Sequence, residues 1–295
     1  MPNSALLPGS GQTWCRRCAR LSGAESLKRN ALAHRNRSEK INISRGQTFS
    51  SSIDFQALRE TPGATRPGAR ALKPPPERLY GRQHGHRLRP RQERLLAETL
   101  PRLRLDPAAP LEGLAGFSSL ALEIGFGGGE HALAEIAAKP EAALIACEVF
   151  ANGVCSLLAR LVPEGAEADA PLPANLRLWD NDARIVLRAL PAASLTRVFL
   201  LFPDPWPKSR HAKRRFVHPA NLSLVARALR PGGEWRIATD DPTYQAWVAE
   251  VFAAQDFFVF APPRAARPRD WAPTRYEIKA LKAGRQPLYW RLIRR

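Results

Sequence analysis

The sequence lacks any apolar run long enough to cross a membrane. A bilayer-spanning helix needs roughly 18–20 consecutive apolar residues, and no run in these 295 residues approaches that length. A hydrophobic content of 44% is still sufficient for a buried core. We therefore expect a soluble protein, with one large domain or two small ones and no membrane partner.

Cysteine is scarce, which argues against a disulfide-stapled secreted domain. The four cysteines are Cys15, Cys18, Cys147 and Cys155, and such sparse use is typical of a reducing compartment such as the cytoplasm. Cys15 and Cys18 form one CxxC, but no second pair or histidine partner stands at zinc-finger spacing. We expect Cys147, in an apolar run, to be a buried thiol, and we predict no metal site.

Acidic residues are few beside the basic ones. Lys and Arg number 45 against 27 Asp and Glu, which gives a net charge of +18. This excess favours an anionic partner such as nucleic acid or a membrane surface. Residues 1–75 are rich in Arg, Ser, Gly and Pro and show weak periodicity. We expect them to form a basic, disordered extension, although a transit peptide has a similar composition.

From about Ala121 the hydrophobic pattern alternates between the periods of strands and helices. The expected strands are residues 120–125, 142–149, 175–180, 196–202, 233–239, 257–260 and 287–293, and the expected helices are residues 130–139, 152–161, 184–190, 219–229 and 242–255. This alternation predicts an α/β fold with a doubly wound, mostly parallel seven-stranded sheet and helices on both faces. We place this domain at residues 76–295.

A glycine-rich turn follows the first expected strand, in the spacing E-x-G-x-G-x-G. Its members are Glu123, Gly125, Gly127 and Gly129. Glycines let a ligand approach the backbone closely, and the following helix presents free N–H groups. The dinucleotide fingerprint G-x-G-x-x-G would need a glycine where Glu130 stands, which weakens a nicotinamide interpretation. A tight turn without a ligand is the simpler alternative.

Carboxylates end the next two expected strands. Glu148 lies 23 residues beyond Gly125, where a carboxylate commonly accepts hydrogen bonds from ribose hydroxyls. Asp182 is suited to accept a hydrogen bond from an adenine amino group, and equally to cap the helix that follows it. The simplest ligand for this set is an adenosine compound without a pyrophosphate.

The fourth expected strand runs into the segment FPDPWPKSRHAKRRF, residues 202–216. Three prolines stiffen the turn that carries Asp204. Trp206 is suited either to stacking on a flipped-out base or to covering the core. The basic residues that follow are suited to phosphate contacts, and they are Lys208, Arg210, Lys213, Arg214 and Arg215.

Together these segments resemble the S-adenosylmethionine-dependent tRNA (guanine-N7)-methyltransferases, of the single-chain bacterial type. The resemblance covers about residues 80–295 and rests on YGRQHGHRLRPRQ, LEIGFGGGEH, ACEVF, DNDAR, FPDPWPKSRHAKRRF, RIATDDPTY and TRYE. The glycine loop is shared by many methyltransferases, whereas FPDPWPK with its basic tail is far more specific. Residues 1–75 fall outside the resemblance.

The resemblance implies a Rossmann-like class I methyltransferase that forms 7-methylguanosine at tRNA position 46, in the variable loop. It implies that S-adenosylmethionine contacts Glu123, Gly125, Gly127, Gly129, Glu148, Asp182 and Asp204, with Asp204 also at the active centre. It assigns substrate binding to Lys208, Asp240, Thr274, Arg275, Tyr276 and Glu277. It assigns RNA contacts to Arg210, His211, Lys213, Arg214 and Arg215. We expect no obligatory protein partner and favour a monomer.

Two other interpretations are open to the sequence. Adenine-N6 and cytosine-N4 methyltransferases use a loop of the form [DNS]-P-P-[YFW], and the order Pro-Asp-Pro-Trp here has no adjacent prolines. A non-catalytic RNA-binding module with a relic cofactor fold is the second, and failure to bind the cofactor would favour it.

Overall fold

The computed structural model describes residues 79–81, 83 and 85–295. The predicted extension at residues 1–75, its boundary at residue 76, and the pair Cys15 and Cys18 lie outside the described residues. Within the described part, none of the helices is long and apolar enough to cross a membrane.

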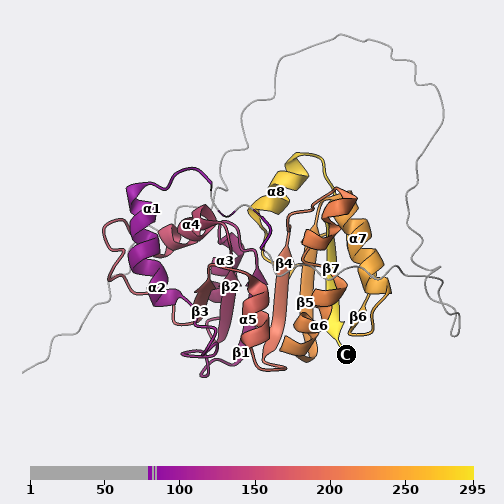
Figure 1. The fold of residues 1–295 in the computed structure, drawn as a ribbon, viewed down its shortest axis with the longest axis horizontal. Coiled ribbons are helices and arrows are strands. Elements are labelled where there is room, and N and C mark those ends of the chain that lie inside the picture. The colour runs from indigo at the N-terminus through magenta and orange to yellow at the C-terminus, as the bar shows by residue number, and fades with distance from the viewer. Residues whose placement is uncertain (1–78, 82, 84) are drawn as a thin grey trace, which may run out of the picture. The chain divides into compact units, whose positions relative to one another are not determined.

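The described chain forms a seven-stranded sheet in the order β3-β2-β1-β4-β5-β7-β6 (Figure 1). The strands are β1 Ser119–Ile124, β2 Ala142–Cys147, β3 Leu176–Trp179, β4 Leu195–Leu201, β5 Leu229–Thr239, β6 Phe258–Phe260 and β7 Leu288–Arg294. Strands β1 to β5 pair in parallel, and β7 is antiparallel to both of its neighbours. The predicted fold class is confirmed.

Helices cover both faces of the sheet. They are α1 Pro90–Arg94, α2 Leu100–Leu103, α3 Glu130–Ala138, α4 Ala151–Leu161, α5 Ala183–Ala189, α6 Pro219–Ala228, α7 Pro242–Ala253 and α8 Arg275–Lys282, with a π-helical turn η2 Leu95–Thr99 and a 3₁₀ turn η3 Ser209–Arg214. Successive side chains of a strand point to opposite faces. In β1, Leu122 and Ile124 accordingly pack with α5, α6 and α7, while Ala121 packs with η2, α2, α3 and α4. The core is thus two apolar layers divided by the sheet.

Besides the 3₁₀ turn η3, two helical segments were not expected from the sequence. The segment from α1 to α2 begins at Pro90, because the first residue of a helix has no helical partner for its N–H and proline lacks that group. The segment buries Leu95, Leu100 and Leu103 against the face of the sheet that α3 and α4 cover. Leu96, Leu100 and Leu103 stand at the helical spacing i, i+4, i+7, so a helix signal was present in the sequence. Helix α8 begins within the TRYE segment, where no helix was expected; Thr274 is its N-cap and its first turn is a capping box.

Candidate active site

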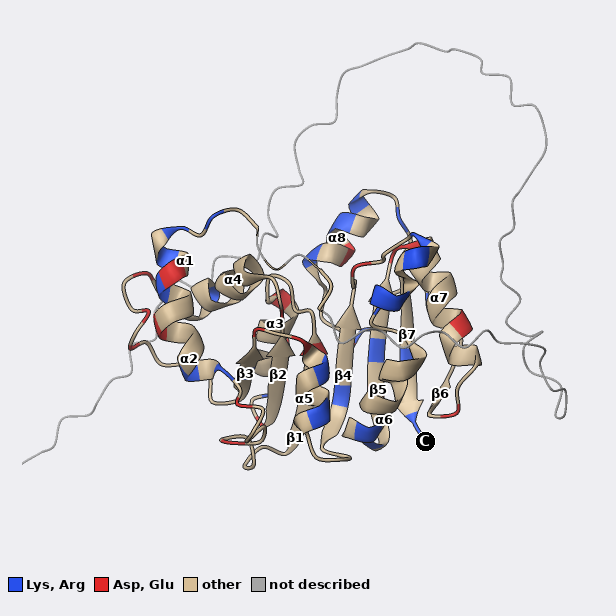
Figure 2. Cartoon of the chain, in the orientation of Figure 1, with Lys and Arg blue, Asp and Glu red and all other residues tan. Residues whose placement is uncertain are grey.

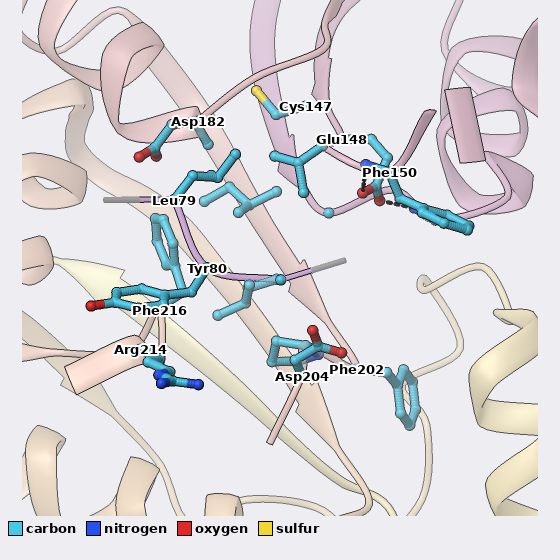
Figure 3. Close-up of a pocket in the computed structure, with 18 of the residues that line it drawn as sticks. Leu79, Tyr80, Cys147, Glu148, Phe150, Asp182, Phe202, Asp204, Arg214 and Phe216 are labelled. Atoms are coloured by element: carbon cyan, nitrogen blue, oxygen red, sulfur yellow. Dashed lines mark hydrogen bonds between the residues drawn. The ribbon is translucent and has the colours of Figure 1, made fainter. Parts of the chain in front are cut away.

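A cavity of about 410 Å³ opens at the carboxyl ends of the parallel strands. The strand order reverses between β1 and β4, and open α/β sheets bind ligands at such a switch point. The wall brings together five residues that the sequence assigned to the cofactor: Gly125, Gly127, Glu148, Asp182 and Asp204 (Figure 3). These residues come from the loops after four different strands, so the fold brings together residues that are far apart in the sequence.

Glu148 ties the glycine loop to the end of β2. Its Oε2 accepts the N–H of Gly127 at 2.7 Å, and its Oε1 accepts the N–H of Phe150 at 2.9 Å. Burial raises the pKa of the Glu148 carboxyl, the backbone N–H donors oppose that shift, and the charge of Asp204 adds to it. The carboxylate therefore holds the loop in place while it faces the cavity.

Gly153 in the first turn of α4 lets that helix approach the glycine loop. A Cβ at this position would lie 2.5 Å from the carbonyl oxygen of Gly127, a backbone atom that has no rotamer to move away. No motif in the sequence marks Gly153. The available signal was a glycine inside an expected helix, a position where glycine usually costs about 1 kcal/mol relative to alanine.

Replacing Gly153 by alanine is expected to push α4 away from the glycine loop. Overpacking of this kind costs roughly 1–3 kcal/mol, more than the gain of about 1 kcal/mol in helix propensity. We expect a lower urea midpoint and weaker S-adenosylmethionine binding by calorimetry. Gly116→Ala is the matched control, since a Cβ there meets nothing within 4 Å. Equal behaviour of the two variants would contradict this packing role.

Glu123 and Gly129 lie beside the cavity and not in its wall. Glu123 is 2% exposed, and its Oε2 lies 3.1 Å from Nδ1 of His131 in α3. Burial lowers the pKa of His131, but the negative charges of Glu123 and Glu135 raise it by more, so the net shift of the pKa is upward. Gly129 caps α3, and a Cβ there would lie 2.6 Å from Leu157 of α4. In this structure neither Glu123 nor Gly129 lines the cavity, and direct contact of either residue with the cofactor stays a prediction.

Asp182 performs the capping role that the sequence allowed. Its carboxylate accepts the N–H of Arg184 at 2.9 Å at the start of α5 and pairs with Nη2 of Arg184 at 2.6 Å. The helix-cap prediction is confirmed. Because Asp182 also lines the cavity, a cofactor role remains compatible with the cap.

The loop after β4 has an uncommon backbone. Phe202 and Trp206 have φ of 53° and 44°, in the left-handed region that bulky residues rarely adopt. Arg215 braces this loop from inside, donating from Nε to the carbonyl of Pro205 at 3.1 Å and from Nη2 to that of Trp206 at 3.0 Å. Asp204 is exposed at the cavity mouth. The strain is concentrated around the residue that the sequence placed at the active centre.

The basic residues after Trp206 differ in their exposure to solvent. Lys208, Arg210 and Lys213 are exposed on or beside η3, whereas Arg215 is 4% exposed. The expectation that Arg215 touches RNA is therefore corrected: the structure gives it the bracing role described above. Arg214 is half-buried in the cavity wall (Figure 3). Partly buried His211 packs its ring edge against Trp206, with 5.8 Å between centroids.

The residues assigned to substrate have three kinds of surroundings. Asp240 pairs with Arg285 at 2.5 Å. Thr274 and Glu277 are buried in the capping box of α8, where Thr274 Oγ1 accepts the N–H of Glu277 at 3.0 Å. Arg275 and Tyr276 are exposed, and Tyr276 reaches the cavity wall. Lys208 does not line the cavity wall.

The segment Leu79–Gly81 also lines the cavity, which the sequence analysis did not predict (Figure 3). A Cβ at Gly81 would lie 3.8 Å from Oδ2 of Asp204. The YGR motif was visible in the sequence as part of the resemblance, but nothing in it indicated a position beside Asp204.

Comparisons with known proteins show the family to which the chain belongs. The model of a family described as "Putative methyltransferase" matches residues 118–289. A tRNA (guanine-N(7)-)-methyltransferase of Granulibacter bethesdensis is 64% identical over 225 residues, covering 76% of this chain and 98% of the relative. Its counterpart in Rhodospirillum rubrum is 45% identical over 229 residues, covering 72% and 86%. Among solved structures, the 16S rRNA methyltransferase KamB aligns with a TM-score of 0.47 and 17% identity, over 65% of this chain and 95% of its own. On the sequence matches, this chain belongs to the family of tRNA (guanine-N(7)-)-methyltransferases.

Proposed function

We propose that this chain transfers a methyl group from S-adenosylmethionine to N7 of a guanine in tRNA, at position 46 of the variable loop. The observation that carries the proposal is the cavity in which the glycine loop, Glu148 and Asp182 converge with Asp204 at its mouth. Membership in the family supports the reaction and the tRNA substrate. Position 46 is supported by the resemblance of the motifs alone.

The cavity residues fit S-adenosylmethionine. Glu148 and Asp182 offer carboxylate oxygens for the ribose hydroxyls and the adenine amino group, and a Cβ at Gly125 would meet nothing within 4 Å. Glu130, at the third position of the dinucleotide fingerprint, pairs with Arg160 at 2.7 Å, so that site is not built for a pyrophosphate. The bound cofactor supplies a methyl group on a positively charged sulfur.

The reaction requires two contributions from the protein: alignment of the reacting atoms and electrostatic stabilisation of the developing charge. Guanine N7 carries a lone pair and no proton, so no base is needed to deprotonate the nucleophile. The protein must hold N7 in line with the methyl carbon, which is proximity and orientation catalysis. The carboxylate of Asp204 favours the positive charge that develops on the purine, and it can accept hydrogen bonds from guanine N1–H and the amino group.

The tRNA backbone is proposed to lie along exposed cations at the cavity edge. Lys208, Arg210 and Lys213 are exposed on or beside η3, the turn that follows Asp204 and Trp206 in the chain. Helix α8 carries further Lys and Arg above the carboxyl ends of the strands (Figure 2). Phosphate contacts of this kind make affinity fall steeply with salt. We assign this work to a monomeric cytoplasmic domain at residues 76–295, with residues 1–75 as a further source of positive charge.

The reaction is tested with purified full-length chain, labelled S-adenosylmethionine and unmodified tRNA, followed by digestion to nucleosides. The expected product is labelled 7-methylguanosine, and the same tRNA with adenine in place of G46 is expected to give none. Label retained with the substituted tRNA would overturn position 46 alone. Label in another nucleoside would overturn the substrate assignment, and absence of cofactor binding would favour the RNA-binding module.

A further inference from the structure

The side chain of Arg214 lies against two aromatic rings at the cavity. Its guanidinium carbon is 4.9 Å from the ring centroid of Tyr80 and 4.8 Å from that of Trp206. Figure 3 shows Arg214 next to the Tyr80 ring. All three side chains line the cavity whose mouth carries Asp204. Two aromatic rings and one flat cation therefore meet where the substrate is proposed to enter.

This arrangement leaves a donor of Arg214 unused. Its Nε is buried and finds no hydrogen-bond partner among the described residues. A buried donor without a partner costs free energy, and the neighbouring Arg215 shows the contrast because two backbone carbonyls receive its donors. Arg214 is therefore better placed to move aside for a ligand than to stabilise the loop as Arg215 does.

Trp206, in contrast, is held firmly. Its carbonyl accepts from Arg215 Nη2, its backbone is in the left-handed region, and prolines flank it on both sides. Strained conformations persist where the surroundings over-determine them, and they are common at ligand sites. The ring is thus presented to the cavity by a stiff loop, while the cation beside it is on a flexible side chain.

The chemistry of the target guanine fits a site made of aromatic rings. Bases that leave their stack are received by aromatic side chains and by arginine planes. Methylation at N7 turns the purine into a flat cation, and aromatic faces attract cations. A guanidinium and an N7-methylated purine are both flat and both carry positive charge. One aromatic subsite can therefore hold either of them.

We propose that Tyr80 and Trp206 form the subsite for the target purine, and that the guanidinium of Arg214 fills this subsite until the base enters. The inference rests on the proposed function, because it takes the purine to be the methyl acceptor. It names the residues that recognise the base and predicts a preference for the methylated, cationic purine.

The subsite is tested with two nucleotides that carry the same phosphate, 7-methylguanosine 5′-monophosphate and GMP, by calorimetry on the full chain. We expect the methylated nucleotide to bind roughly 5- to 30-fold more tightly, which corresponds to a cation–π energy of about 1–2 kcal/mol. Equal affinities would overturn the proposal.

Variants separate the roles of the three residues. Tyr80→Leu and Trp206→Leu are expected to bring the affinity ratio towards one, while Tyr80→Phe and Trp206→Phe keep most of it. Arg214→Met removes the competing cation at similar length and is expected to tighten binding of the methylated nucleotide. If Arg214→Met weakens both nucleotides equally, Arg214 is a phosphate ligand and the proposal fails. Tyr80 precedes the first helix, so its variants test the subsite even if a Trp206 variant fails to fold.

The same preparation distinguishes the two proposals. Wild-type chain that forms 7-methylguanosine in tRNA but binds both nucleotides equally retains its function and loses the subsite. Wild-type chain that prefers the methylated nucleotide but transfers no methyl group retains the subsite and loses the proposed reaction.

Discussion

Replacing Asp204 by asparagine is expected to lower the rate constant of methyl transfer about 10²- to 10³-fold, the usual cost of removing a preorganised electrostatic contact to developing charge. The variant removes the negative charge and keeps the size of the side chain. Asp204 is exposed at the cavity mouth, so the core should not respond. Single-turnover formation of 7-methylguanosine with saturating cofactor and tRNA measures this step directly.

The control for Asp204 is another exposed aspartate that lies away from the cavity wall. Asp256, before β6, is exposed and does not line the cavity. Asp256→Asn should leave the rate constant unchanged. An Asp204→Asn rate within a few-fold of the control would mean that alignment alone drives the reaction and that the carboxylate has no electrostatic role.

The sequence predicted well where local pattern and topology coincide. Parallel strands end at the same edge of a sheet, so residues just after several strands must meet there. Glu148, Asp182 and Asp204 obey this rule, and all three line the cavity. The turn around Asp204 was also legible, because proline restricts the backbone whatever surrounds it.

The sequence was less informative about the direction in which individual side chains point. Glu123 lies inside β1, where side chains alternate between the two faces of the sheet, and its carboxylate lies 3.1 Å from Nδ1 of His131. That partner was not expected from the sequence, and contact of Glu123 with the cofactor stays a prediction. Arg215 ends a basic run that reads as one surface, yet the 3₁₀ turn η3 directs it inward while Lys213 stays exposed. Such choices depend on tertiary packing and leave little trace in residue spacing.

Contacts between distant segments were the least accessible. Gly153 matters because α4 meets the backbone of Gly127. Tyr80 matters because the segment Leu79–Gly81 lies beside Asp204 and Arg214. In both cases the sequence showed the residue but not its neighbour. The capping box of Thr274 and Glu277 is an intermediate case, since its spacing was present but its helix was not expected.

Replacing Glu148 by glutamine is expected to weaken S-adenosylmethionine binding about 100-fold, because an unsatisfied buried donor costs about 1–3 kcal/mol and the ribose acceptor is lost as well. The carboxylate accepts the N–H of Gly127 and of Phe150, one on each oxygen. Glutamine has one acceptor oxygen, and its NH₂ would face a second donor. The glycine loop would therefore lose its tether at the point where the cofactor is proposed to lie.

The pH dependence of binding provides an independent readout of Glu148. Only the ionised carboxylate can accept both N–H groups and, in the proposed complex, the ribose hydroxyls, so we expect cofactor binding to lower its pKa. By linkage, affinity is complete above the pKa of the free protein and falls by up to about tenfold per pH unit below it. Because burial, with Asp204, raises that pKa, the decline should begin at a higher pH than for an ordinary glutamate.

Glu141→Gln is the matched control for Glu148→Gln. Glu141 is exposed just before β2, at the opposite end of the strand that leads into Glu148. The control should keep wild-type affinity and the wild-type pH curve, whereas Glu148→Gln should bind weakly and lose that decline. Asp204→Asn should shift the decline to lower pH, since one of the charges that raise the pKa of Glu148 is removed. Unchanged affinity in Glu148→Gln would show that the glycine loop keeps its shape without this carboxylate and that the ribose finds its acceptor elsewhere.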